Sequence, residues 1–565
     1  MTAVAMTAQT LSVTTGSGST AIQAAEAGTM TYSHSAGTIT IGNTTYNVSD
    51  ITKIDITEAS SAAETGDGTN SVSVVYNGTS ATVTVSSDIA DLITVSKSGA
   101  HVNITQSDDV AEEITYTLSG SSADGEFYMS GSYKATIELN GLALTNATPV
   151  TSGAAIHIQN GKRINIKVVE GTTNTLADAG SGDQKGCLYV KGHAEFKQKG
   201  TLNIVGNAKH GIKAGEYISV KNATINVTSA AGDGINCNEY FLMESGTVSI
   251  SGTSDDGIQC DLDGTTSTGE TTDHEDEDSG NIYIEGGTLT IKTTAADSKG
   301  IKATGDLTIS DGTISVTNTG SSTSSDDASK AIKSEGSMTI SGGTITASSS
   351  THEAIESKGA LDISGGYIYA TASDDAINSA SHMTISGGYI MANSTGNDGI
   401  DANGNLYIKG GNVFAIATTQ PEVALDANTE GGYNLYISGG NVVAIGGFEN
   451  GATISSGTAK QASYSKGSWY ALYNGSTAAF AFKIPSNNSM GSSMAVYTTG
   501  TPALKSGVTG SGSSFWSGNG YSDASGGSDV SLSTYSSGGG MGGGGNNPGG
   551  GGPGGGGPGG GGPGR

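Results

Sequence analysis

The sequence is short of basic residues. Its 565 residues contain 25 Lys and Arg against 53 Asp and Glu, so the formal net charge is −28. The arginines are Arg163 and Arg565 alone. Nucleic-acid binding depends on a basic surface, so the composition excludes a nucleic-acid partner. A polyanionic ligand would be repelled as well, unless divalent cations mediated the contact.

Cysteine, proline and long apolar runs are also scarce. Cys187, Cys237 and Cys260 are too few, and odd in number, for a disulfide framework. No stretch is long and apolar enough to span a bilayer, so we expect no membrane span. Glycine is abundant, with 90 residues against 8 Pro. Because Gly, Ser and Thr form helices poorly while Thr, Val, Ile and Tyr suit strands, we expect an all-β protein.

A motif of Gly or Ala followed by an aliphatic residue returns along the chain, mostly every 22 to 25 residues. A fixed period of this size predicts a solenoid. The pairs are Gly211-Ile212, Gly234-Ile235, Gly257-Ile258, Gly300-Ile301, Ala331-Ile332, Ala354-Ile355, Ala376-Ile377, Gly399-Ile400 and Ala424-Leu425.

Apolar residues alternate within each repeat, as in LTISDGTISV and MTISGGTITA. A period of two predicts strands, and the Gly-Gly or Asp-Gly between them predicts a tight turn. Three short strands per repeat, each with one buried side, close into a coil, and coils stack at ~4.8 Å. We therefore predict a right-handed parallel β-helix of three-strand coils. Cys237 and Cys260 fall in an inward ladder and are interpreted as core residues, with a disulfide or a metal site as the alternative.

An outward ladder becomes aromatic in the later coils, at Tyr367, Tyr369, Tyr389 and Phe414. Flat aromatic faces in a row suit the stacking of sugar rings, so these four are candidate carbohydrate-binding residues. The alternative is packing beneath the C-terminal segment or a neighbouring chain.

Acidic residues recur just before the Gly/Ala-Ile pair, and a second carboxylate often precedes them. Adjacent coils place such groups ~5 Å apart, where carboxylates without a counter-charge repel one another. Calcium takes six to eight oxygen ligands in loose geometry and would relieve this repulsion. Asp and Gly as simple turn residues are the alternative. The candidate calcium ligands are Asp233, Asp255, Asp256, Asp261 and Asp263 in the earlier coils, and Asp374, Asp375, Asn378, Asp398 and Asp401 in the later ones.

Lysines occupy the same columns in the middle coils, among them Lys302 and Lys333. One interpretation is a Lys–Asp ladder that offsets like charges. Another is contact with a uronate carboxylate, and a third is a general base, whose pKa would have to be lowered by burial or nearby cations.

The phrases DGINC, DGIQCDLDG, SKGIKATGDLTISDGTI and IELNGLALTN resemble a secreted bacterial carbohydrate-binding family over residues 110 to 450. The resemblance implies a right-handed parallel β-helix similar to polysaccharide lyases, bound Ca²⁺, and binding to polygalacturonate and cellulose without catalysis. The sequence departs from the pattern at EVALDAN, where Val423 replaces the acid.

The ends of the chain differ from the repeat. MTAVAMTA resembles the end of a secretory signal, so we expect residues 1–8 to be a signal-peptide remnant and the protein to be secreted or on the surface of a bacterial cell. We predict an N-terminal β cap over 9–100, the β-helix over 101–458, a C-terminal β cap over 459–537 and a Gly/Pro-rich tail over 538–565.

These observations favour calcium-dependent, non-catalytic binding of a uronate-containing polysaccharide or cellulose. The first alternative is a calcium-dependent polysaccharide lyase, in which Lys302 or Lys333 would act as the base. The second is a surface adhesin or structural solenoid, in which the outward ladders serve assembly.

Overall fold

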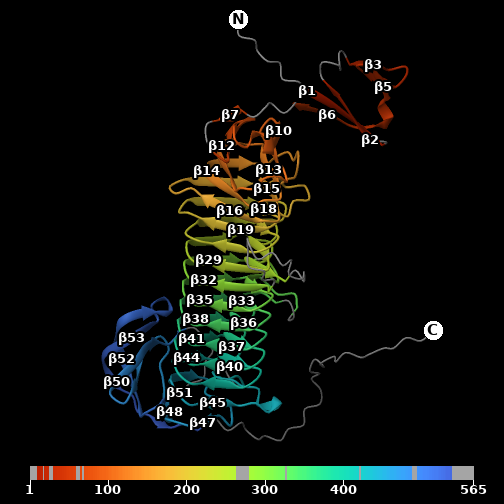
Figure 1. Cartoon of the computed structure of the whole chain (residues 1–565). Coiled ribbons are helices and arrows are strands. Elements are labelled where there is room, and N and C mark those ends of the chain that lie inside the picture. The colour runs from red at the N-terminus through yellow and green to blue at the C-terminus, as the bar shows by residue number, and fades with distance from the viewer. Residues whose placement is uncertain are drawn as a thin grey trace, which may run out of the picture.

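The computed structural model describes residues 9–16, 18–23, 30–58, 64–66, 69–262, 279–324, 328–418, 421–486 and 493–536. The described chain is built of β-strands, with four short 3₁₀ turns: η1 (Val48–Asp50), η2 (Ala90–Leu92), η3 (Thr429–Gly431) and η4 (Trp516–Gly518). Stacked coils form a long solenoid, with smaller β-structures at its two ends (Figure 1). Within this described part, no helix is long and apolar enough to cross a membrane.

A first column of strands forms a 13-stranded sheet that begins with the antiparallel pair β10 (Ile93–Ser98) and β11 (His101–Gln106). From β11 onward each strand pairs in parallel with the strand one coil later. The strands are β13 (Glu126–Ser130), β15 (Ile156–Gln159), β18 (Gly186–Val190), β21 (His210–Ala214), β24 (Ile235–Asn238), β27 (Ile258–Asp261), β30 (Lys299–Ala303), β33 (Lys330–Ser334), β36 (Ile355–Ser357), β39 (Ile377–Ser379) and β42 (Ile400–Ala402).

Two further columns run beside it and belong to a 31-stranded sheet. The second column contains β16 (Arg163–Val168), β19 (His193–Lys197), β22 (Ile218–Val220), β25 (Tyr240–Met243), β28 (Asn281–Ile284), β31 (Leu307–Ile309), β34 (Met338–Ile340), β37 (Leu361–Ile363), β40 (Met383–Ile385), β43 (Leu406–Ile408), β45 (Leu435–Ile437) and β47 (Thr453–Ile454). The third contains β17 (Thr173–Ala177), β20 (Thr201–Gly206), β23 (Thr224–Ala230), β26 (Thr247–Ser251), β29 (Thr288–Thr293), β32 (Thr313–Asn318), β35 (Thr344–Ser349), β38 (Tyr367–Ala372), β41 (Tyr389–Ser394), β44 (Asn412–Ile416) and β46 (Asn441–Ile445). The predicted all-β class and the long parallel sheets of a solenoid are thus confirmed.

The anchor isoleucines stack inside the solenoid. Ile235 pairs with Ile258, which pairs with Ile301, and all three are fully buried. Burying each such side chain contributes about 1.5–3 kcal/mol, and parallel pairing satisfies the backbone at the same time. Cys237 and Cys260 pair in the same register as buried free thiols, in agreement with their interpretation as core residues.

The Gly-Gly turns let each coil lie close against the next. Gly388 has a φ of +86°, and a Cβ there would meet the carbonyl oxygen of Gly365 at 2.7 Å. Only glycine adopts this left-handed conformation without strain and leaves room for the preceding coil. The repeated Gly-Gly is therefore a requirement of stacking.

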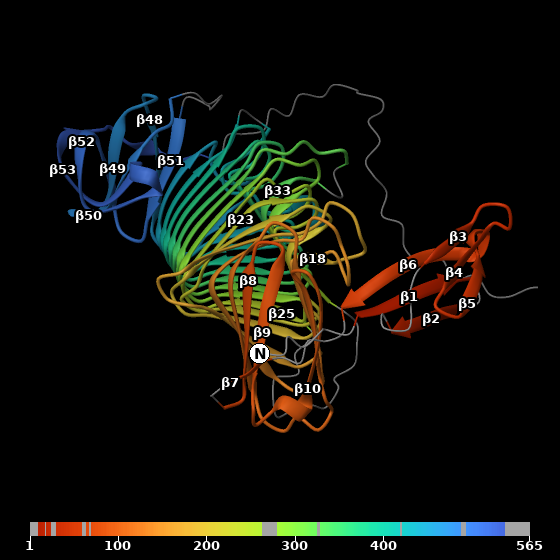
Figure 2. The same ribbon diagram turned by 90° about the horizontal axis from the view of Figure 1, so that it is seen from above.

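Two structures lie at the N-terminal end. The antiparallel pair β8 (Ser71–Asn77) and β9 (Ser80–Ser86) joins the solenoid through β12 (Ile114–Ser122), which pairs in turn with β14 (Ala135–Thr145), and the short β7 (Glu64–Gly66) pairs with β9. Further out, β1 (Gln9–Thr15), β2 (Gly18–Gln23) and β6 (Ile51–Glu58) form one sheet, and β3 (Thr31–Ser33), β4 (Thr38–Ile41) and β5 (Thr44–Asn47) form another. We call residues 9–58 the N-terminal module; it projects away from the solenoid (Figure 2).

The C-terminal segment packs against the last coils of the solenoid. Strand β51 (Ser493–Thr498) pairs antiparallel with β46, the last strand of the third column, and with β48 (Thr458–Ser463), which pairs with β54 (Ser533–Thr534). A closed barrel of β49 (Trp469–Asn474), β50 (Thr477–Lys483), β52 (Pro502–Phe515) and β53 (Gly520–Asp529) lies beside β41 and β44 (Figure 1). We call this the C-terminal barrel.

Candidate functional site

One outward ladder runs along the first column of strands. It takes the residue directly after the anchor Ile of each coil, and the parallel register places these residues in line. We call it the polar ladder; its members are Lys213, Asn236, Gln259, Lys302, Lys333, Glu356, Asn378 and Asp401. Its character passes from cationic and amide to acidic along the solenoid.

The acid before the anchor pair has a structural role that the sequence did not indicate. One carboxylate oxygen accepts the backbone N–H of the same position one coil later: Asp233 from Asp256 at 3.1 Å, and Asp375 from Asp398 at 3.0 Å. Asp398 likewise accepts from the N–H of Val423 at 2.6 Å. Each acid therefore satisfies a backbone donor between coils, and its second oxygen is left for other partners.

A pocket of about 370 Å³ opens at the cationic end of the polar ladder. Lys213 lies in it, and its ammonium donates to Asn236 Oδ1 at 2.5 Å and to Asn238 Oδ1 at 2.6 Å. Burial lowers the pKa of Lys213 below its ordinary value. The pocket therefore holds a lysine whose proton is easier to remove than that of an exposed one. Its other lining residues include Lys185, Lys209, His210, Asp255 and Asp261.

The structure brings three of the predicted calcium ligands together beside this pocket. Asp233, Asp255 and Asp256 each offer a carboxylate oxygen within 4.8 Å of the others. Burial, and then the charge of Asp233, raise the pKa of Asp256 to about 7. A histidine and a lysine lie against the group: His210 Nδ1, which accepts the backbone N–H of Asp233 at 3.1 Å, is 3.2 Å from the Asp233 carboxylate, and Lys302 Nζ is 3.8 Å from Asp256.

The other two predicted calcium ligands of the earlier coils, Asp261 and Asp263, are not part of this group of three carboxylates. Asp261 accepts hydrogen bonds from Gln259 Nε2 at 2.5 Å and from Asn236 Nδ2 at 3.3 Å, so it faces the pocket among amides. Asp263 lies outside the described residues, as does the acidic insertion that follows it.

In the middle coils, lysines form short ion pairs with glutamates. Lys330 Nζ lies 2.9 Å from Glu353 and 2.5 Å from Glu356, and Lys358 contacts Glu356 at 2.6 Å. Lys333 lies 2.6 Å from Glu335. These contacts match the charge-offsetting interpretation of the lysines. A general base has to be able to accept a proton, and the ion-paired ammonium of buried Lys333 fits that role poorly.

The later coils form an acidic run with a different balance. Asn378 Nδ2 donates to Asp375 Oδ2 at 3.1 Å and to Asp401 Oδ2 at 2.8 Å, which links two adjacent coils. Asp401 contacts Asp426, and Asp426 contacts Glu449. Among the described residues, none of these four carboxylates forms an ion pair with a basic side chain. We call Asp375, Asn378, Asp401, Asp426 and Glu449 the acidic run.

Burial and like charge act together in the acidic run. Burial is the first cause and neighbouring carboxylates the second in raising the pKa of Asp375 to about 8 and of Asp401 to about 9. Burial also raises the pKa of Asp398 to about 7. In a metal-free protein such groups hold or share protons near neutral pH. A hard cation would replace those protons, and carboxylate and amide oxygens are the ligands that calcium takes, so the donor set fits Ca²⁺.

Asp374, the remaining predicted ligand, turns away from this set. Its Oδ1 accepts from Asn397 Nδ2 at 2.8 Å, and its Oδ2 lies 3.2 Å from His352 Nδ1. The adjacent carboxylates of the Asp374-Asp375 pair thus face different neighbours. Both residues lie in the bend between β38 and β39, where the turning backbone directs the two side chains to different neighbours.

The aromatic ladder is covered, which corrects its interpretation as a sugar-stacking platform. Phe414 is 0% exposed and packs against Phe482 of the C-terminal barrel, with ring centroids 4.8 Å apart. Phe515 of the same barrel lies 5.4 Å from the ring of Tyr367 and 4.5 Å from that of Tyr389. Tyr369 is a half-buried member of the same cluster. Packing beneath the C-terminal segment, the alternative that the sequence left open, is what the structure shows.

A buried histidine cluster lies on the second column. His193 Nδ1 is 2.7 Å from Glu216 Oε2, and His193 Nε2 is 3.4 Å from Glu239 Oε2. Burial opposes protonation of His193, but the hydrogen bonds to the two glutamates outweigh it and raise its pKa. Because both ring nitrogens face a carboxylate, the group is best described as a buried ion triad.

Comparison with known proteins places the coil region in context. Residues 98–376 match the model of a family described as "Carbohydrate-binding domain-containing protein". No curated protein matches the chain. Among solved structures, the chain is similar to a polysaccharide lyase-like protein from C. thermocellum, solved as a gadolinium derivative, with 20% identity and a TM-score of 0.37 over 48% of this chain and 96% of that one. The family match makes residues 98–376 of the solenoid similar to carbohydrate-binding domains.

Proposed function

We propose that the protein binds a uronate-containing polysaccharide without cleaving it, in the presence of calcium, along the polar ladder. The observation that carries the proposal is the ladder itself, which aligns one polar side chain per coil over eight consecutive coils, from Lys213 to Asp401. A polymer lying parallel to the solenoid axis would meet these side chains at ~4.8 Å intervals. The right-handed three-strand coil and location outside a bacterial cell are parts of the same proposal.

The charge distribution assigns two roles along the ladder. Lys213 and Lys302, at the cationic end, are suited to contact uronate carboxylates directly. At the acidic end, calcium would be held by Asp375, Asn378 and Asp401, with Asp398 beside them. The trio of Asp233, Asp255 and Asp256 is the second candidate calcium site. Bound calcium would neutralise the carboxylates of the protein and attract those of the polymer.

The test is calorimetric titration of the whole protein with oligogalacturonate, first with calcium and then with a chelator. Ultraviolet absorbance is followed in parallel for unsaturated product, and insoluble cellulose is included in a pull-down. We expect calcium-dependent binding that is lost in the double variant Asp375→Asn/Asp401→Asn, with no product. Asp362→Asn is the matched control, because Asp362 is an exposed acid on β37 of the second column.

A second candidate function, a polysaccharide lyase, is favoured by one specific observation. Lys213, with its pKa lowered by burial, lies in a pocket with further cationic groups. In its neutral form such a lysine could accept the proton from the carbon beside a uronate carboxyl. A C=C bond forms to the neighbouring carbon, the glycosidic C–O bond there breaks, and water protonates the leaving oxygen. Unsaturated product that disappears in Lys213→Met would establish the lyase and overturn the non-catalytic proposal.

A further inference from the structure

The N-terminal module has a core and a pocket of its own. Leu11, Val13 and Ile41 are buried between its two sheets, and Tyr46 packs against them. The module precedes residue 98, so it lies outside the stretch that matches the carbohydrate-binding family. Whatever it binds is therefore a question separate from the function proposed for the solenoid.

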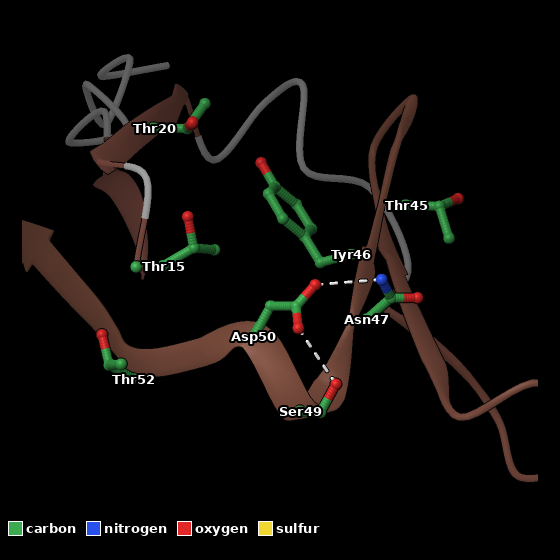
Figure 3. A pocket seen from close by; sticks show the side chains of 9 residues that line it. Thr15, Thr20, Thr45, Tyr46, Asn47, Ser49, Asp50 and Thr52 are labelled. Carbon is green, nitrogen blue, oxygen red and sulfur yellow. Dashed lines mark hydrogen bonds between the residues drawn. The ribbon is translucent and has the colours of Figure 1, made fainter.

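The pocket of the module has a volume of about 670 Å³, within the range of small-ligand sites. Tyr46 and Asp50 lie in its middle, with threonines around them (Figure 3). Among the described residues that line it, Asp50 alone is charged. Five hydroxyl groups contribute to the wall, from Thr15, Thr20, Thr45, Ser49 and Thr52.

Two polar groups in this pocket are arranged for a ligand. The carboxylate of Asp50 is fixed from both sides, since Asn47 Nδ2 donates to it at 2.9 Å and Ser49 Oγ at 3.1 Å. The hydroxyl of Tyr46 is buried and has no hydrogen-bond partner among the described residues. A buried polar group without a partner is costly, and a bound ligand that hydrogen-bonds to it would remove that cost.

We propose that this pocket binds a neutral sugar unit of a glycan, independently of calcium and of the solenoid. A tyrosine ring supplies an apolar face, while the carboxylate, the amide and the hydroxyls supply donors and acceptors matched to sugar hydroxyls. An anionic sugar is disfavoured, because the described lining includes a carboxylate and no cation. A metal ion is disfavoured too, because a single carboxylate is a poor ligand set for a divalent cation.

The test uses the full-length protein and neutral oligosaccharide probes, namely cellohexaose, xylohexaose and mannohexaose, with trigalacturonate for comparison. Binding is measured calorimetrically in the presence of a chelator, which removes the calcium-dependent contribution of the solenoid. We expect at least one neutral probe to bind. Asp50→Ala should weaken that binding about tenfold or more, and Tyr46→Phe, which keeps the ring and the core, by a few-fold.

Tyr32→Ala is the matched control, because Tyr32 is an exposed tyrosine of the same module that does not line the pocket. Asp375→Asn/Asp401→Asn should leave the neutral binding unchanged, so failure of this inference and failure of the solenoid proposal are distinguishable. The inference is overturned if no neutral probe binds, if binding survives both Asp50→Ala and Tyr46→Phe, or if trigalacturonate is the preferred ligand in chelator.

Discussion

The middle coils and the last coils of the solenoid differ in charge at equivalent positions. Carboxylates are paired with lysines in the middle coils and lack basic partners among the described residues of the last ones. In the middle, Lys330 neutralises Glu353 and Glu356 at distances of 2.9 and 2.5 Å. One and two coils after Glu353, the equivalent positions contain Asp375 and Asp398. The equivalents of Glu356 in the same two coils are Asn378 and Asp401. The described carboxylates of the acidic run contact only one another, amides, hydroxyls and backbone N–H groups.

The difference shows which positions the fold constrains. The anchor isoleucines are fully buried in both regions, because the coil needs them for its core. The charged positions lie outside that apolar core, so their charge differs from coil to coil within one fold, although Lys330, Glu356 and Asp375 are themselves buried. Where the chain leaves carboxylates without counter-charges at a cost in stability, a ligand that supplies the charge is the simplest explanation.

The largest effect is expected from breaking the ion pairs of the middle coils. Lys330→Met would leave Glu353 without its ammonium and Glu356 with Lys358 alone, in a site where Lys330 and Glu356 are both buried. Removing one partner of a buried pair typically lowers the free energy of unfolding by about 3–5 kcal/mol. Denaturant unfolding measures the loss.

Lys221→Met is the control for that change, because the pair of Lys221 with Glu244 is exposed and its removal should lower the stability by less than about 1 kcal/mol. A loss of the same size in both variants would mean that the buried pairs have no special role. Recovery in Lys330→Met/Glu356→Gln would confirm that the unpaired carboxylate causes the loss.

Removing a charged residue from the acidic run should raise the stability of the metal-free protein instead of lowering it. In chelator, Asp401→Asn is expected to raise the thermal midpoint, because it removes one of several carboxylates that repel each other. Calcium at a hundredfold excess over its dissociation constant should stabilise the unchanged protein by about 2.7 kcal/mol, and the variant by much less. Differential scanning calorimetry with and without calcium decides, and an equal calcium shift in both proteins would exclude the acidic run as the site.

The pH dependence of the metal-free protein offers a third comparison. The folded-state pKa values of Asp375, Asp398 and Asp401, about 8, 7 and 9, lie above those of unfolded aspartates. The folded state therefore binds more protons than the unfolded state between about pH 4 and pH 9, so stability should fall as pH rises through this window. Unfolding midpoints in chelator across the window should show a shallower fall for Asp375→Asn/Asp401→Asn than for the unchanged protein.

Glu356 should add the reverse trend. Burial works against its ionisation, but Lys330 and Lys358 lower its pKa below the ordinary value. Its contribution to stability is present above the unfolded pKa and is lost as pH falls through the folded one. Glu356→Gln should therefore reduce the stability at neutral pH and remove part of the loss at acid pH.

The periodic features were predictable from the sequence, and the contacts across distant segments were not. The Gly/Ala-Ile spacing defined the ladder, because a fixed period forces equivalent residues into one column. The covering of Phe414 depends on Phe482 and Trp516, which belong to a segment without the repeat and carry no signal of where they pack. Aromatic residues in a row indicate an apolar surface, and only the tertiary structure shows what contacts it.

Adjacency in the sequence also failed to show which of the candidate calcium ligands share a site. The Asp374-Asp375 pair suggests two ligands, but in the bend between β38 and β39 one side chain contacts His352 and the other Asn378. The hydrogen bonds that Asp233 and Asp375 accept from the next coil could have been inferred, since the acid recurs where the next coil has a backbone donor to satisfy. The lowered pKa of Lys213 could not, because burial is a property of the folded chain.

The smallest effect on stability, and the sharpest separation of structure from binding, is expected at Lys302. It lies one coil before Lys333, on the side of the middle coils that faces away from the acidic run, 3.8 Å from Asp256 and with a quarter of its side chain exposed. An ion pair this long and this open contributes less than about 1 kcal/mol, so Lys302→Met should leave the unfolding midpoint nearly unchanged. If the ladder binds uronates, the same variant should weaken oligogalacturonate binding in calorimetry by several-fold. Lys333→Met, which breaks a buried 2.6 Å contact with Glu335, should lower the stability more. Unchanged binding in Lys302→Met would move the polymer off this part of the ladder and leave the acidic run as its remaining place on the solenoid.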